Sequence, residues 1–175
     1  MIVANAGIGI NGAAGKNTNE NIEFANNLMF GGPIRLIEHY LPKMKERKSG
    51  RIVIISSIGA LIPMPKSAIY AAVKSGIYAY GVSLNEELRN DNISVTVSLP
   101  GYVQTNIHKR SGLEHLTKQI PSWMWVSSEQ VVKETEIASI KGYSKVIPGM
   151  LYRVASIFFN FKISKFIWKL MNGRK

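Results

Sequence analysis

The sequence predicts an α/β fold in which a parallel sheet lies between two layers of helices, a three-layer α/β/α arrangement. Two near-continuous β-branched runs, residues 51–57 and 93–99, are typical of strands covered on both faces. Segments with helical patterns separate these runs from shorter ones at residues 1–4 and 145–147. Strands that alternate with helices indicate parallel pairing, because the chain must cross back over the sheet between them.

Glycines, prolines and capping residues place the boundaries of the elements. In chain order, we expect a strand at 1–4, a loop at 5–19, a helix from about 19 to 48, a strand at 51–57, a helix at 67–90, a strand at 93–99, an irregular stretch at 102–126 with some helix near 105–118, a helix from 127 or 128 to about 141, a strand at 145–147 and a helix at 150–170. Thr18 or Asn19 would cap the first helix. The run Gly31-Gly32-Pro33 should bend or loosen that helix.

Length and composition narrow the class of protein. The 175 residues suit a single domain, and 46% of them are hydrophobic, which excludes a disordered chain. The absence of cysteine excludes disulfides, thiolate zinc sites and cysteine nucleophiles. Residues 1–15 lack the pattern of a signal peptide, and no apolar run is long enough to span a membrane, so we expect a cytoplasmic protein.

The formal net charge of +11 permits attraction to phosphate-rich partners or to an anionic membrane surface. No segment resembles a nucleic-acid reading motif, so we expect no nucleic-acid partner. Residues 150–175 form a basic, amphipathic extension that is rich in aromatic residues and has no acid. It could lie on an anionic membrane surface, or it could dock on the body of the protein with its lysines reaching into solvent; both readings stay open.

The pair Tyr70 and Lys74 is the sharpest chemical feature. Residues four apart on a helix share a face, so a phenol would lie near an ammonium group. The positive charge favours the phenolate, and the pKa of Tyr70 should therefore fall from about 10 toward neutral. Such a tyrosine can act as general acid in carbonyl reduction or as general base in alcohol oxidation. The spacing alone is weak evidence, because a surface tyrosine and lysine often share it.

Small or polar residues follow three successive strands. Asn5-Ala6-Gly7 follows the first strand, Ser57 ends the second, and Pro100-Gly101 follows the third, with Thr105 shortly after. Because the carboxyl ends of parallel strands meet at one edge of a sheet, these residues would line one site. A hydroxyl at Ser57 could hydrogen-bond a substrate oxygen and steady its developing charge.

The chain resembles the short-chain dehydrogenase/reductase family, whose fold is Rossmann-like. The matching segments occur in the family's order and spacing from residue 1 to about 105. They are Asn5-Ala6-Gly7, Phe24-Ala25-Asn26-Asn27-Leu28, Ile55-Ser56-Ser57, Tyr70-x-x-x-Lys74 and Pro100-Gly101-x-Val103-x-Thr105. The resemblance implies an NAD(P)-dependent oxidoreductase that interconverts a carbonyl and a secondary alcohol. It does not distinguish NAD from NADP, and it does not name the small-molecule substrate.

The resemblance also implies a role for each matched residue. Tyr70 would be the catalytic acid/base, and Lys74 would lower its pKa and hold the nicotinamide ribose. Ser57 would orient and polarise the substrate carbonyl. Asn27, with Asn26 as an alternative, would hold a water molecule in a proton relay. The remaining cofactor contacts would be Asn5, Ala6 and Gly7 beside the adenosine half, and Pro100, Gly101 and Thr105 at the nicotinamide end.

One part of the family pattern has no counterpart. The strand, Gly-rich turn and helix that cradle the pyrophosphate should precede Asn5, and at about 30 residues per strand–helix–strand unit they would occupy roughly 70–80 residues. We therefore expect an N-terminally truncated domain over residues 1–175 that binds cofactor poorly alone, with an unpaired apolar edge at residues 1–4. The alternative is a catalytically silent remnant that acts through dimerisation or through the basic extension.

Further expectations concern partners and metals. The resemblance implies a homodimer formed by the helices that contain Asn27 and Tyr70. Residues 123–125, Trp-Met-Trp, fall where the family has a mobile substrate lid, which leaves a lipophilic substrate or ordinary packing open. His108 and His115 could share a helical face, but no carboxylate or cysteine completes a metal set, so we expect no metal.

Overall fold

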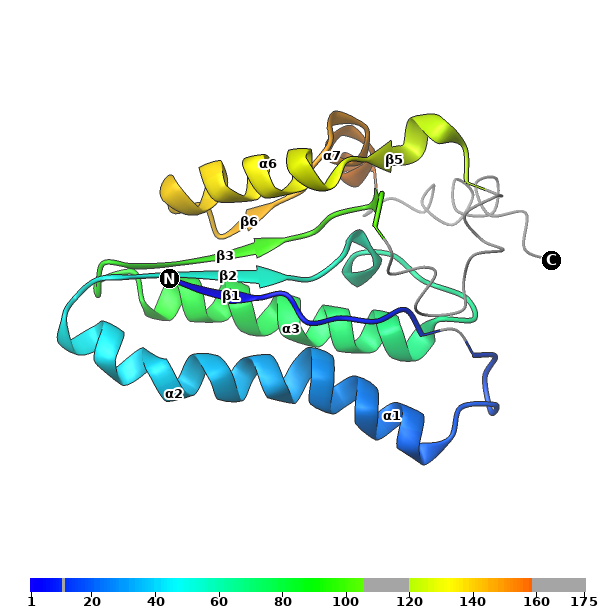
Figure 1. Cartoon of the computed structure of the whole chain (residues 1–175), viewed down its shortest axis with the longest axis horizontal. Coiled ribbons are helices and arrows are strands. Elements are labelled where there is room, and N and C mark those ends of the chain that lie inside the picture. The colour runs from blue at the N-terminus through cyan, green and yellow to red at the C-terminus, as the bar shows by residue number, and fades with distance from the viewer. Residues whose placement is uncertain (11, 106–119, 159–175) are drawn as a thin grey trace.

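The computed structural model describes residues 1–10, 12–105 and 120–158, and its centre is a parallel sheet (Figure 1). The sheet has the order β1-β2-β3-β6, and each neighbouring pair runs parallel. Its strands are β1 (Ile2–Ala4), β2 (Gly50–Ile55), β3 (Ile93–Ser98) and β6 (Lys145–Val146). The predicted parallel sheet is therefore confirmed, and each predicted strand lies within about two residues of its expected bounds.

Helices cover both faces of the sheet. On one face lie α2 (Gly32–Glu46) and α3 (Ala68–Glu87), with α1 (Asn19–Asn26) packed against α3, and on the other face lies α6 (Ser128–Ile140) with α7 (Met150–Ile157) beside it (Figure 1). Two of the predicted caps form. Thr18 Oγ1 accepts a hydrogen bond from the Asn21 N–H at 3.3 Å, and Ser127 Oγ accepts one from the Gln130 N–H at 3.1 Å.

The break between α1 and α2 is a π-helical turn, η1 (Asn27–Gly31), which precedes the predicted bend by about one turn. The Gly32 N–H donates to the Asn27 carbonyl five residues back. A Cβ on Gly32 would lie 2.5 Å from that carbonyl oxygen, so the close approach requires glycine. Pro33 has no N–H to donate back along the helix, and the regular hydrogen-bond ladder is interrupted here.

The main core lies between the two central strands and helices α2 and α3. It includes Ile37 from α2, Ile77 from α3, Ile54 from β2 and Val95 from β3. Gly81 lets α3 approach the sheet, because a Cβ there would lie 2.4 Å from Val97 Cγ2. A smaller cluster of Ala25, Met29 and Val73 joins η1 to the first half of α3. These two cores hold the carboxyl end of the sheet and the start of α3 in one rigid unit.

The stretch after β3 contains more regular structure than predicted. Strand β4 (Tyr102–Val103) pairs in parallel with β5 (Trp125–Val126), and a short 3₁₀ turn, η3 (Ser122–Met124), precedes β5. The helix expected near 105–118 falls mainly on residues 106–119, outside the described residues, and so does the part of the C-terminal helix beyond residue 158. None of the helices described here is long and apolar enough to cross a bilayer.

Candidate active site

The loops that follow β2 and β3 leave the sheet side by side. The Ser56 N–H donates to the Ser98 carbonyl at 2.8 Å, and the Ile58 N–H donates to the Pro100 carbonyl at 2.9 Å. These bonds extend the strand pairing past the ends of both strands. The two predicted segments, around Ser57 and around Pro100, are thereby brought to one edge of the sheet.

Ser57 and Tyr70 lie on either side of Gly59. Ser57 caps the short 3₁₀ turn η2 (Ile58–Ala60), where its Oγ accepts a hydrogen bond from the Gly59 N–H at 3.1 Å. A Cβ added to Gly59 would lie 3.4 Å from Ser57 Oγ and 3.5 Å from Tyr70 Cε1. Ser57 is also close enough to act on Tyr70 as a hydrogen-bonding neighbour that lowers the pKa of the phenol. The structure therefore joins these two predicted site residues directly.

Lys74 lies one helical turn beyond Tyr70 on the same face of α3. Its Nζ is 5.8 Å from the centroid of the Tyr70 ring and donates to the Ile55 carbonyl at 3.0 Å. The side chain is almost fully covered, with 4% of the residue exposed. Gly7, after β1, is close as well, because a Cβ there would lie 3.7 Å from Nζ. The ammonium thus links α3 to the ends of β1 and β2.

Ser56 is a site residue that the sequence reasoning missed. Its buried hydroxyl donates to the Lys74 carbonyl at 2.8 Å and so ties α3 to the end of β2. The adjacent Ser57 drew attention because it was predicted to end the strand, thirteen residues before Tyr70. Two hydroxyl residues at the end of an apolar strand are the signal that could have suggested separate roles for them.

Burial governs the protonation of this site. Burial lowers the pKa of Lys74 to about 8. Burial also raises the pKa of Tyr70, and this effect exceeds the lowering by the hydrogen bond from Ser57. The expectation that the pKa of Tyr70 falls toward neutral is therefore wrong for this structure. Desolvation of the phenol outweighs the attraction of an ammonium that lies over the ring.

Asn27 begins the π-helical turn η1, which packs against α3. Its side chain is exposed, as is that of Asn26. Among the described residues, no direct side-chain hydrogen bond links Asn27 to Ser57, Tyr70 or Lys74. The turn is anchored through buried Met29, whose sulfur accepts a hydrogen bond from the Ile8 N–H at 3.5 Å. The turn that carries Asn27 is thus tied to α3 and to the segment after β1.

The segments that the resemblance assigns to the cofactor lie at the same edge. Asn5 and Ala6 are exposed directly after β1. Gly101 lies against the ring of Tyr152, and a Cβ there would be 2.1 Å from the nearest ring atom. Thr105 is exposed at the end of the described stretch. The structure brings Gly7 to Lys74 and Pro100 to the Ser57 turn.

Tyr152 on α7 is the second residue that the sequence reasoning missed. Only 5% of it is exposed. Its hydroxyl donates to the Met124 carbonyl at 2.7 Å and accepts from the Tyr102 N–H at 3.1 Å. It therefore holds β4 and the turn before β5 in place beside Gly101. A tyrosine in a basic, aromatic segment gave no sequence signal for this role.

The residues considered as a substrate lid differ in their surroundings. Met124 is buried, Trp125 packs on Tyr102 with ring centroids 5.8 Å apart, and Trp123 is 65% exposed. His108 and His115, considered for metal binding, lie outside the described residues, which contain no group of three metal-ligating side chains. Trp123 is therefore the only one of the three lid residues that solvent reaches freely.

A family model described as short chain dehydrogenase matches residues 1–115. The chain is 37% identical over 107 residues to dehydrogenase/reductase SDR family member 7B of Rattus norvegicus, covering 61% of this chain and 33% of that protein. It is 31% identical over 119 residues to 3-ketodihydrosphingosine reductase of Bacteroides thetaiotaomicron, covering 68% and 44%. The chain thus spans between a third and a half of the length of these relatives.

Solved structures show the same fold. A short-chain dehydrogenase from Sphingobium yanoikuyae in complex with NADPH superposes with a TM-score of 0.78 at 24% identity, covering 99% of this chain and 65% of that one. A gluconate 5-dehydrogenase from Burkholderia cenocepacia in complex with NADP and tartrate gives a TM-score of 0.74 at 17% identity, covering 87% and 64%. These likenesses confirm the three-layer α/β arrangement with a Rossmann-like sheet.

Proposed function

The chain belongs to the short-chain dehydrogenase family, and on that premise we propose that it is an NAD(P)-dependent oxidoreductase that interconverts a carbonyl and a secondary alcohol. The observation that carries the proposal is the contact of the Ser57 and Tyr70 hydroxyls beside the Lys74 ammonium. These groups can bind a carbonyl oxygen and give it a proton. Their retention in one place favours an enzyme over the alternative of a catalytically silent remnant.

Tyr70 is the proton donor in the direction of carbonyl reduction. The raised pKa of its phenol keeps the proton on Tyr70 at neutral pH, which is the form that reduction needs. Ser57 Oγ accepts from Gly59, so its single O–H can turn from Tyr70 to the substrate oxygen when substrate binds. With both hydroxyls on one oxygen, charge that develops there is stabilised as the proton moves from Tyr70.

Lys74 acts on the phenolate that Tyr70 becomes. Its ammonium lies within 5.8 Å of the ring centroid and opposes the negative charge left by proton transfer. A pKa of about 8 keeps Lys74 largely protonated at neutral pH. Asn27 would hold a water molecule through which the proton on Tyr70 is replaced.

The residues present fit a nicotinamide cofactor. Lys74 has three N–H donors and gives one to Ile55, which leaves two for ribose hydroxyls. Exposed Asn5 and Ala6 lie on the same side, and Gly7 leaves the approach to Lys74 open. Such a cofactor supplies the hydride, which no side chain can supply. The solved relatives that carry NADPH or NADP in their descriptions support this assignment.

The substrate is proposed to be a lipophilic ketone. One relative is named for the reduction of 3-ketodihydrosphingosine, and another is named a ketoacyl reductase. Exposed Trp123 offers an apolar surface in the predicted lid segment. A panel of 3-ketodihydrosphingosine, a ketoacyl thioester and a polar keto acid, each tested with NADH and NADPH, would rank these classes.

The test of the reaction compares two tyrosines of α3. Tyr70→Phe should lower the rate of ketone reduction by about 10²–10⁴-fold, the range of a lost general acid. Tyr78→Phe, which removes a hydroxyl eight residues along the same helix, should leave the rate near that of the unaltered chain. Full activity of Tyr70→Phe, or no NAD(P)H-dependent reduction of any ketone by the unaltered chain, would overturn the proposal.

Peripheral membrane contact is proposed as well, because α7 exposes apolar side chains. Met150, Val154 and Ile157 are all more than half exposed and recur at helical spacing. The basic residues that follow in the sequence suit an anionic bilayer. Sedimentation with vesicles that contain phosphatidylserine should recover the protein, and Val154→Glu together with Ile157→Glu should abolish recovery. Equal recovery of both forms would contradict this proposal.

A further inference from the structure

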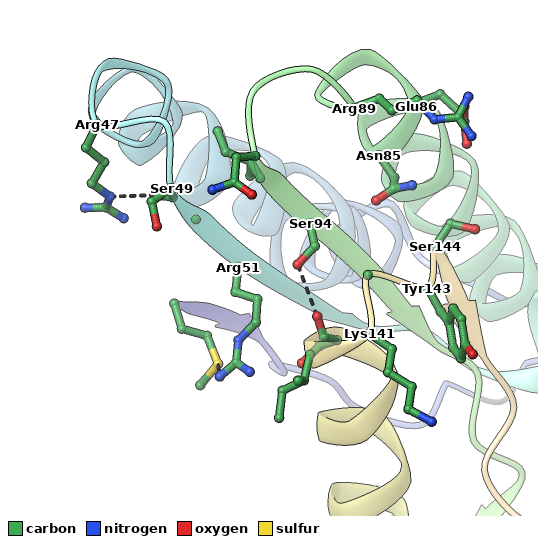
Figure 2. Close-up of a pocket in the computed structure, with 17 residues that line it drawn as sticks. Arg47, Ser49, Arg51, Asn85, Glu86, Arg89, Ser94, Lys141, Tyr143 and Ser144 are labelled. Carbon is green, nitrogen blue, oxygen red and sulfur yellow. Dashed lines mark hydrogen bonds and ion pairs between the residues drawn. The ribbon is translucent and has the colours of Figure 1, made fainter.

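A hollow of about 930 Å³ lies at the amino ends of β2 and β3, at the opposite edge of the sheet from the candidate active site (Figure 2). The starts of both strands and the carboxyl ends of α2, α3 and α6 line it. We call it the basic hollow. Its charged and hydrogen-bonding side chains include Arg47, Arg51, Asn85, Arg89, Ser94 and Lys141.

Cations outnumber acids in this hollow. Glu86 is the acid among its lining residues, and it forms an ion pair with Arg89 at 3.6 Å. Arg47, Arg51 and Lys141 form no ion pair with any described residue. Arg47 instead donates from Nε to the Ser49 carbonyl at 2.6 Å. Three positive charges around one concave surface therefore remain without a counter-charge from the described parts of the chain.

Helix ends account for only part of this charge. Arg47 and Lys141 directly follow the last residues of α2 and α6, where cations stabilise the negative ends of the helix dipoles. Arg51 is different, because it is the second residue of β2 and lies at no helix end. It is half-buried, and its guanidinium donates to the Met1 thioether at 3.2 Å, a weak acceptor. Arg51 therefore has its charge only weakly satisfied.

A neutral side chain of the hollow, Asn85, adds hydrogen-bond donors. It uses its Oδ1 to accept from the Val95 N–H at 3.0 Å, which leaves its amide hydrogens available. Ser94 adds no free donor, because its one hydroxyl hydrogen goes to the Ser139 carbonyl at 3.2 Å. Figure 2 shows Arg51, Ser94 and Lys141 on the wall of the hollow, where they come from β2, β3 and the end of α6. Donors and positive charge together match an anion that has several oxygen atoms.

We propose that the basic hollow binds a phosphate-bearing small molecule, with Arg51 and Lys141 holding the phosphate oxygens. A guanidinium pairs with phosphate through two parallel hydrogen bonds, and a lysine adds a mobile charge. The site is separate from the proposed cofactor position, because the six residues of β2 place the two edges of the sheet about 20 Å apart. The inference does not rest on the proposed reaction.

The test is titration calorimetry of the chain with inorganic pyrophosphate at fixed ionic strength. Pyrophosphate should bind saturably, and Arg51→Gln or Lys141→Gln should each weaken binding about tenfold or more, as expected for a lost charged hydrogen bond. Arg35→Gln and Lys133→Gln remove equal charges outside the hollow and should leave the affinity within about twofold. Arg51 is half-buried and the other three side chains are exposed, and thermal melts would verify that each variant is folded.

Three outcomes would overturn the proposal. The first is binding no stronger than that of chloride at the same ionic strength, and the second is an affinity of Arg51→Gln equal to that of the unaltered chain. Amide NMR would locate the bound pyrophosphate, because binding in the hollow should shift the amide resonances of Gly50, Ser94 and Gly142. Shifts confined to the surroundings of Tyr70 and Lys74 would place the anion at the cofactor edge and would also refute it. Competition by vesicles that contain phosphatidic acid would separate a lipid headgroup from a soluble phosphate as the source.

Discussion

The ammonium of Lys74 donates a hydrogen bond to the backbone carbonyl of Ile55 across 3.0 Å, at the point where β2 ends. The pair joins α3 to the sheet and fixes the position of a buried charge beside Tyr70. Ser56 donates its hydroxyl hydrogen to the backbone carbonyl of the same lysine. Lys74 is therefore held by two neighbouring residues, Ile55 and Ser56, and its burial follows from that arrangement.

Lys74 should release its proton near pH 8, well below the ordinary lysine value of 10.5. The pKa of Lys74 is lower in the folded chain than in the unfolded chain. Between pH 8 and pH 10.5, the unfolded chain therefore holds a proton on Lys74 that the folded chain has lost. The free energy of unfolding should therefore rise over this window, by up to roughly 3 kcal/mol relative to a Lys74→Met variant. NMR titration of the Lys74 side chain gives the pKa directly. A midpoint above 10 would contradict the burial argument.

Tyr70 should ionise above pH 10, and removal of its partner should push the ionisation higher. Ser57 donates a hydrogen bond that lowers the pKa, so Ser57→Ala should raise it further. Ultraviolet difference spectra between each protein and its Tyr70→Phe counterpart isolate this one phenol. A related kinetic result is expected, because alcohol oxidation needs the phenolate and its rate should still be rising with pH at about pH 10. Ionisation near neutral pH would show that Lys74 governs the site after all.

Much of this fold could be predicted from local patterns. The β-branched runs at 52–55 and 93–97 read as buried strands, and Thr18 and Ser127 marked helix starts, because strand burial and caps are encoded within a few residues. The π-helical turn at Asn27–Gly31 was displaced from its predicted position. The glycine and proline that cause it follow the turn instead of lying within it.

The features that were missed depend on contacts between distant segments. Tyr152 reaches back across 50 residues to the Tyr102 N–H, and no pattern around either residue encodes that distance. The pKa of Tyr70 was predicted in the wrong direction for the same reason. The spacing to Lys74 is visible in the sequence, but the burial that opposes it arises from the η2 turn, which closes over α3 only in the folded chain.

Gly101→Ala should destabilise the protein by about 1–3 kcal/mol, the usual cost of overpacking. Its added methyl would meet the ring of buried Tyr152 at 2.1 Å, and the ring is held by hydrogen bonds at its far end. Gly7→Ala is the matched control, because its methyl meets nothing closer than 3.7 Å and its stability should change little. Urea unfolding curves measure both. Equal stability of the two variants would mean that the Tyr152 ring moves aside freely.

Tyr152→Phe tests the hydroxyl of the same residue without changing its ring. The variant loses a donor to the Met124 carbonyl and an acceptor for the Tyr102 N–H. The backbone groups of Met124 and Tyr102 would both lose this partner, and the free energy of unfolding should fall by about 1–3 kcal/mol. Tyr143→Phe, which alters an exposed tyrosine, should be neutral. Amide exchange at Tyr102 should also accelerate in Tyr152→Phe. Unchanged exchange there would contradict the idea that the Tyr152 hydroxyl holds β4 in place.

Val3→Lys should reduce self-association of the chain. β1 pairs only with β2 in the sheet of the described residues, so its outer side presents backbone N–H and C=O groups, and Val3 beside them is 48% exposed. A bare apolar edge templates pairing with another chain, and a lysine on an edge strand blocks such pairing. Val132→Lys adds the same charge at an exposed site on α6, away from the edge. Sedimentation velocity over a concentration series should show less assembly for Val3→Lys than for Val132→Lys; equal assembly would exclude the β1 edge as the contact.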